Sequence, residues 1–95
     1  MMKVELDINS KLEVLNKIGE VTVEKENGEW LCKHEDAMIK RDNSIIAYFM
    51  YMPSKDAAIN HYYDFVAQVG TSILLVPGFT EYAFDGAEFI KVEKA

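Results

Sequence analysis

The sequence predicts a single α+β domain over residues 1–95, in which one small antiparallel or mixed sheet packs on one long helix, 55–69, and a second, short helix, 11–18. Three observations lead to this class. Apolar residues make up 49% of the chain and charged residues 27%, which is typical of a globular protein and not of a disordered one. Hydrophobic periods of two and of 3.6 residues follow one another along the chain. No internal repeat, low-complexity tract or Gly/Ser/Pro-rich linker divides it.

The first 19 residues predict a strand followed by the short helix. Residues 3–8 alternate polar and apolar side chains, which is the pattern of a half-buried strand, and residues 11–18 have apolar side chains at helical spacing. Asn9 and Ser10 are residue types that cap helices, and Gly19 is typical of a left-handed helix end. The apolar positions are Val4, Leu6 and Ile8 in the strand and Leu12, Leu15 and Ile18 in the helix.

The next segment predicts a β-hairpin. Residues 21–25 and 30–34 again have a period of two, and the turn between them, Glu26 to Glu29, contains Asn27-Gly28. This dipeptide is the strongest short signal for a two-residue hairpin turn, because both residues tolerate a positive φ at little cost.

After a polar break at residues 41–44, the run from Ile45 to Met52 contains no charged residue and shows no alternation. These features indicate a central strand that is covered on both faces.

The long helix is predicted over residues 55–69. Pro53 ends the preceding strand, Ser54 is a suitable N-cap, and Gly70 is typical of the residue that follows a helix. Within this helix an apolar face is formed by Ala58, Ile59, Tyr62, Phe65, Val66 and Val69.

The C-terminal quarter predicts three more strands. Residues 71–76 indicate a buried strand, and residues 80–84 and 87–92 flank Asp85-Gly86, a candidate type I′ turn. Such a turn is expected to place Tyr82 opposite Phe89. The whole order fits a ferredoxin-like βαββαβ topology with an added C-terminal hairpin. The alternative is an antiparallel meander packed on one helix, in which the first strand continues in place of the short helix.

Charge and cysteine content limit the classes of partner and the compartment. Sixteen acidic against ten basic residues give a net charge of −6, which disfavours direct binding to nucleic acid or to an anionic membrane. Cys32 is the only cysteine, so no internal disulfide can form, and a reducing compartment, the cytoplasm, is expected. The start of the chain has no signal-like apolar region, and no apolar run reaches the length of a membrane span.

No catalytic or metal-binding constellation stands out in the sequence. Cys32 and His34 should project from the same face of a strand, but the further ligands of a zinc site are missing at any recognisable spacing. Catalysis by Cys32 and His34, or by His61, lacks a third orienting group. The glycines are isolated, and no G-x-S-x-G motif is present. The sequence therefore predicts a protein that is not an enzyme and has no metal or other cofactor.

The remaining unusual feature is the aromatic content, which suits a binding surface. The expected function is a small acidic protein-binding module, such as an adaptor, an inhibitor or an immunity-type protein, whose partner is another protein with a basic surface, for example a nucleic-acid-binding protein. The alternatives are a small-molecule-sensing regulatory domain and a homodimeric accessory subunit, in which a second copy covers the aromatic side chains. The candidate binding residues are Tyr48, Tyr51, Tyr62, Tyr63, His61, Glu35 and Asp36.

Overall fold

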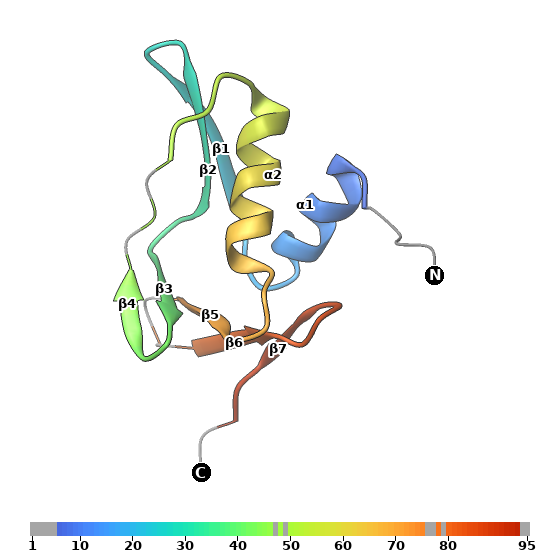
Figure 1. Cartoon of the computed structure of the whole chain (residues 1–95), viewed down its shortest axis with the longest axis vertical. Coiled ribbons are helices and arrows are strands. Elements are labelled where there is room, and N and C mark those ends of the chain that lie inside the picture. The colour runs from blue at the N-terminus through green and yellow to red at the C-terminus, as the bar shows by residue number, and fades with distance from the viewer. Residues whose placement is uncertain (1–5, 47, 49, 76–77, 79, 94–95) are drawn as a thin grey trace.

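The computed structural model describes residues 6–46, 48, 50–75, 78 and 80–93, and these form an α+β fold with two helices and seven strands (Figure 1). The helices are α1 (Ile8–Asn16) and α2 (Lys55–Val66). The strands are β1 (Val21–Glu26), β2 (Glu29–His34), β3 (Ala37–Arg41), β4 (Ser44–Ile46), β5 (Thr71–Leu75), β6 (Thr80–Phe84) and β7 (Phe89–Lys91). Neither helix of this described part is long and apolar enough to cross a bilayer.

The strands form two antiparallel sheets instead of one. β1 and β2 make a two-stranded sheet, and the other five strands make a sheet of order β4-β3-β5-β6-β7 in which every neighbouring pair is antiparallel. The α+β class is thus confirmed, but the ferredoxin-like topology is not. One part of it is present, because β4 and β5 run in the same direction on either side of β3 and α2 connects them. The meander alternative describes β5, β6 and β7 but not the two-sheet arrangement.

The predicted first strand is wrong where the structure describes it. The Asp7 side chain accepts a hydrogen bond of 2.8 Å from the backbone N–H of Ser10, and helix α1 begins at Ile8. Asp7 is therefore the N-cap in place of Asn9 or Ser10. Residues 3–5 lie outside the described residues. The helix starts and ends earlier than the predicted 11–18, and Gly19 does not have a positive φ.

The first hairpin is confirmed, and a second one was missed. Asn27 and Gly28 have φ of 52° and 83° and join β1 to β2, as their sequence predicts. Asp42 and Asn43, with φ of 52° and 65°, join β3 to β4 in the same way. The predicted central strand 45–52 is consequently reduced to the short edge strand β4. Residues 47 and 49 of that predicted strand lie outside the described residues.

At residues 50–52 the chain runs alongside the first hairpin. The backbone groups of Met52 and Trp30 exchange two hydrogen bonds, of 2.7 and 2.8 Å, which form an isolated antiparallel bridge to β2. This bridge fixes the position of residues 50–52 beside the hairpin.

Helix α2 has the predicted N-cap but is shorter than predicted. The Ser54 side chain accepts from the N–H of Ala57 at 3.1 Å. The helix ends at Val66 because Ala67 leaves the helical conformation, with ψ of 65°, and Gly70 follows with φ of 97°. Val69 is therefore not on the buried face, and 78% of its surface is exposed.

The C-terminal hairpin is present in a different register from the predicted one. Phe84 is opposite Phe89, and Tyr82 is opposite Lys91. The reason is a longer turn, in which the Asp85 carboxylate accepts from the N–H groups of Ala87 and Glu88 at 2.8 and 2.9 Å. The two phenylalanine rings make an edge contact at 5.2 Å.

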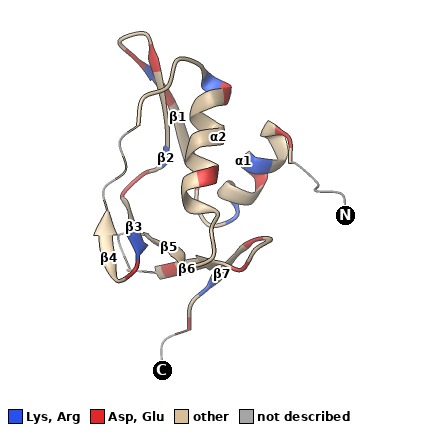
Figure 2. Ribbon diagram, viewed as in Figure 1, with Lys and Arg blue, Asp and Glu red and all other residues tan. Residues whose placement is uncertain are grey.

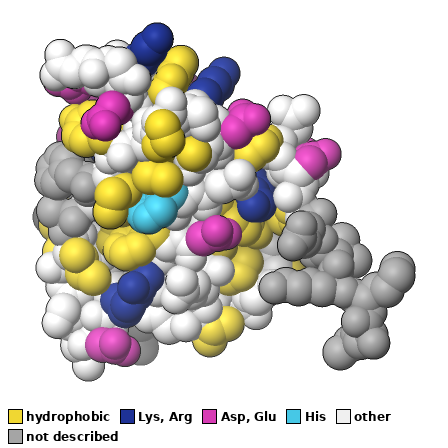
Figure 3. All heavy atoms as spheres, turned by 45° about the horizontal axis from the view of Figure 1, so that its top comes forward, with side chains coloured by type: hydrophobic (Ala, Val, Ile, Leu, Met, Phe, Trp, Pro, Cys, Tyr) yellow, Lys and Arg dark blue, Asp and Glu magenta, His cyan; other side chains and the backbone are white. Residues whose placement is uncertain are grey.

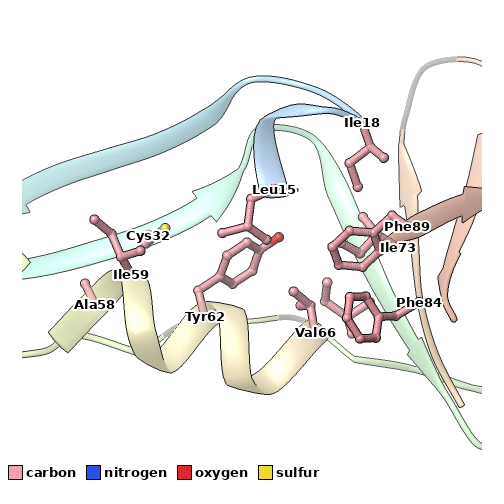
Figure 4. Packing of buried hydrophobic residues seen from close by; sticks show 11 residues of the cluster. Leu15, Ile18, Cys32, Ala58, Ile59, Tyr62, Val66, Ile73, Phe84 and Phe89 are labelled. Atoms are coloured by element: carbon pink, nitrogen blue, oxygen red, sulfur yellow. The ribbon is translucent and has the colours of Figure 1, made fainter. Parts of the chain in front are cut away.

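One core joins both sheets through α2 (Figure 4). The first half of the helix, at Ala58 and Ile59, faces Cys32 of the hairpin, and the last turn, at Val66, faces the five-stranded sheet. Tyr62 lies between the two halves. The core cluster consists of Leu15, Ile18, Cys32, Ile39, Ala58, Ile59, Tyr62, Val66, Ile73, Phe84 and Phe89.

Candidate functional site

Cys32 and His34 lie on one face of β2, as their spacing predicts, and that face is turned to the core. The side chain of Cys32 is fully buried, and His34 is only 3% exposed. Burial raises the pKa of the Cys32 thiol to about 12, so at neutral pH the sulfur is a neutral thiol and not the nucleophilic thiolate.

Both ring nitrogens of His34 are used within the protein. Nε2 lies 2.8 Å from the backbone oxygen of Leu15, which can only accept, so Nε2 carries the proton. Nδ1 therefore accepts from the Tyr62 hydroxyl at 2.7 Å, and the same hydroxyl accepts from the backbone N–H of His34 at 3.3 Å. Burial lowers the pKa of His34 and favours this neutral ring. The histidine links α1, β2 and α2.

A metal site is not found in the part of the chain that the structure describes. None of its His, Cys, Asp and Glu side chains gather in a group of three that could hold an ion.

Tyr62, one of the predicted binding residues, is an interior residue and not a surface one. Only 1% of it is exposed, and its hydroxyl is fully engaged with His34. Assigning it to a binding surface was wrong because residue 62 falls on the face of α2 that packs into the core.

Tyr48 and His61 form a partly buried pair at the edge of the core. The Tyr48 hydroxyl lies 2.8 Å from Nδ1 of His61. The Tyr48 ring packs against Tyr62 and Phe65, each at 5.1 Å, and burial raises the pKa of Tyr48 to about 12. Figure 3 shows a histidine at the surface with hydrophobic side chains gathered around it.

Tyr63, Glu35 and Asp36 are placed apart from that pair. Tyr63 is half-buried between the helices, where the Lys11 ammonium lies 5.4 Å from its ring centre. Glu35 and Asp36 are exposed in the turn between β2 and β3, and Glu35 accepts from the Thr22 hydroxyl at 3.4 Å. The predicted binding residues therefore do not form one site.

Tyr51 is the predicted residue that lies in the most distinctive surroundings. It is 39% exposed, and its hydroxyl donates to the Glu26 carboxylate at 3.3 Å. The pKa of Tyr51 is raised, first by the negative charge of Glu26 and also by the charges of Glu24 and Glu29. An exposed aromatic ring is thus set among three carboxylates.

The register of the hairpin explains why these carboxylates lie together. Glu26 is directly opposite Glu29, and Glu24, two residues earlier, projects from the same face. Lys25 projects from the other face, where its ammonium lies 5.9 Å from the Trp30 ring centre. Figure 2 shows the charged residues along this hairpin.

We name the surface formed by Glu24, Glu26, Glu29 and Tyr51 the glutamate–tyrosine surface. Sequence reasoning singled out Tyr51 but missed the three glutamates. The alternation of side chains along the hairpin could have shown that the three glutamates share a face. Only the Met52–Trp30 bridge, which the sequence does not predict, brings Tyr51 next to them. Comparisons of the chain with protein-family models, curated proteins and solved structures find no match.

Proposed function

We propose that the protein is a non-enzymatic acidic binding module whose glutamate–tyrosine surface engages a basic patch on another protein. The observation that carries the proposal is the exposed Tyr51 ring among three carboxylates. An exposed ring offers apolar contact area and a face for a cation, while the carboxylates attract and orient basic side chains.

The cross-strand pair of Glu26 and Glu29 adds to this argument. Like charges directly opposite each other in a hairpin are destabilising. The Tyr51 hydroxyl relieves this only in part, because a neutral donor does not cancel a charge. An arginine or lysine side chain from a partner would add positive charge beside this pair, so binding stabilises the hairpin and the complex together.

The surroundings of the surface also suit a protein partner. Met50, one residue before Tyr51, is 43% exposed and extends the contact area with a flexible apolar side chain. Two of the three side chains considered for catalysis, the Cys32 thiol and the His34 imidazole, are buried and engaged in packing or hydrogen bonds.

The test begins with a partner captured at low salt from the source cells, purified and titrated by calorimetry. Replacing Glu24, Glu26 and Glu29 by glutamine is expected to weaken binding by about tenfold or more, because three attractive charges are removed from the contact. Raising the salt concentration from about 0.05 to 0.5 M should also weaken the binding of the unmodified protein to its partner.

A matched control removes the same charge elsewhere. Glu13, Glu20 and Glu88 are exposed and lie outside the glutamate–tyrosine surface, and their replacement by glutamine leaves 13 acidic against 10 basic residues, a net charge of −3, as in the test variant. The control is expected to bind within about threefold of the unmodified protein. Equal weakening by both variants would show that only the overall charge matters and would refute the surface.

Tyr51 is tested separately. Y51A removes the ring and is expected to weaken binding more than Y51F, which removes only the bond to Glu26. Unchanged affinity of Y51A would exclude this residue from the contact.

A further inference from the structure

The outer face of the five-stranded sheet is the second unusual surface of the molecule. Side chains alternate across a sheet, so the residues next to Ile39, Ile73 and Phe84, which pack into the core, project to the other side. The apolar residues of this outer sheet face are Met38, Ile45, Leu74, Ala83 and Ile90.

These five side chains take no part in the core cluster. Ile45 is 60% exposed and Ile90 49% exposed, while the other three are half-buried. Among the residues that the structure describes, α2 packs on the opposite face, against Ile39 and Ile73. An apolar sheet face that crosses all five strands is unusual for a monomer and typical of an interaction surface.

The arrangement of the two exposed isoleucines indicates what covers the face. One row of paired residues runs across the sheet as Ile45, Lys40, Ser72, Ala83 and Ile90. β5 is the central strand, and the two isoleucines lie at the two ends of the row, each two strands or about 9.6 Å from β5. The row therefore ends in an exposed isoleucine at the same distance on either side of β5.

We propose that a second copy of this chain packs on the outer sheet face, with a two-fold axis parallel to β5. Such an axis places β4 of one copy over β7 of the other and β3 over β6. Each Ile45 then faces Ile90 of the second copy, and the Leu74 side chains meet at the axis. Two sheets packed in this way lie about 10 Å apart, the usual distance in a β-sandwich.

The charges of the face fit the same symmetry. On the described strands the outer sheet face has one cation, Lys40 on β3, and one anion, Glu81 on β6. Because the axis places β3 over β6, Lys40 of each copy lies diagonally across from Glu81 of the other. The Ser72 hydroxyl donates to Glu81 at 2.8 Å and holds that carboxylate on this face. The two copies thus meet through a neutral surface although each chain has a net charge of −6.

The size of the face predicts a weak dimer. Five strands about 4.8 Å apart and about four residues long cover a footprint of roughly 300 Å², which is small beside the roughly 800 Å² per partner of a standard interface. This dimer uses a surface other than the glutamate–tyrosine surface, so the two proposals succeed or fail independently.

The test is sedimentation equilibrium of the full chain from about 10 µM to 1 mM, over which a weak dimer should raise the average mass from the monomer toward twice that value. I45K and I90K are each expected to keep the protein monomeric at concentrations where the unmodified chain is dimeric. In either variant, dimer formation would bury the charge of the new lysine in the contact. V69K is the matched control, since Val69 is exposed outside this face, and it should dimerise normally. Circular dichroism confirms that each variant is folded.

A charge exchange tests the geometry itself. K40E and E81K should each abolish the dimer. In either variant residues 40 and 81 have the same charge, and the two-fold axis brings residue 40 of each copy close to residue 81 of the other. An equimolar mixture of K40E and E81K should form a heterodimer, because every pair across the axis is opposite again. A chain that stays monomeric throughout would overturn the proposal. Loss of the dimer in I45K but not in I90K would also overturn it, because that result would indicate pairing through the β4 edge. Failure of the K40E and E81K mixture to associate would overturn it as well.

Discussion

At the scale of single residues, the interior depends on the Tyr62 hydroxyl, which satisfies two polar groups of His34. Replacing Tyr62 by phenylalanine leaves Nδ1 and the backbone N–H of His34 without a partner in the core. We expect Y62F to lose about 1–3 kcal/mol of unfolding free energy, measured by urea denaturation. Y48F is the control, because its hydroxyl bonds to the partly exposed His61, where water can replace it, and its loss should be smaller. Equal losses would contradict this role of Tyr62.

Cys32 provides a second prediction at this scale. Its pKa of about 12, against an ordinary value of 9.0, means about a thousandfold less thiolate at pH 8, and the fully buried sulfur is also shielded from reagents. We expect the thiol to react with an aromatic disulfide reagent at least about a hundredfold more slowly in the native protein than in urea. Equal rates would mean that the hairpin opens readily.

At the scale of elements, the left-handed turn residues fix the strand pairing. Gly28 has a φ of 83°, and an added Cβ there meets nothing within 4 Å, so G28A measures backbone strain alone. We expect G28A to cost about 1 kcal/mol in urea denaturation. Gly19 is the control, because its φ is not in the left-handed region and its Cβ would make only ordinary contacts, at 3.5 Å with Leu75 and 3.8 Å with His34. G19A should be neutral or slightly stabilising; a cost equal to that of G28A would contradict the explanation.

The elements predicted correctly are those whose signals are local. Asn27-Gly28 specifies its hairpin because the turn geometry resides in those two residues, and Ser54 specifies the start of α2 because it caps its own helix. The missed elements lie where two local patterns predict different structures, such as the Asp42-Asn43 turn and the apolar run that follows it. Asp42-Asn43 adopts the same left-handed turn as Asn-Gly, and this turn folds β4 back on β3 in place of a long central strand.

At the scale of the whole molecule, His34 makes stability depend on pH, because it joins α1, β2 and α2 in its neutral form. The groups that face it are the Tyr62 hydroxyl and the backbone of Leu15 and Gly19, and none of them stabilises a charged ring enough to offset burial. The pKa of His34 is lowered in the folded state. The unfolded chain therefore binds the proton first, and stability that is complete above about pH 6.5 decreases as the pH falls below it.

We expect the free energy of unfolding to fall between pH 7.5 and 5.5 by up to about 1.4 kcal/mol. Urea denaturation at pH 7.5, 6.5 and 5.5 measures it, and H34Q should show a flatter dependence. The lowered pKa values of Asp7 and Asp85, which come from hydrogen bonds with backbone N–H groups, act in a separate window below about pH 3.8. A dependence that persists unchanged in H34Q would assign the effect to other groups.

The sequence by itself determined the α+β class, the start of α2 at its Ser54 cap, the Asn-Gly hairpin and the common face of Cys32 and His34, because period, capping and turn chemistry act between residues close in the chain. Only the tertiary structure decided that the strands divide into two sheets, that Tyr62 belongs to the core, and that Tyr51 lies among three glutamates. It also decided that Ile45 and Ile90 share an outer face. These arrangements depend on strand order and on which segments pack on α2, and both are set by contacts between residues far apart in the chain, which no local pattern encodes.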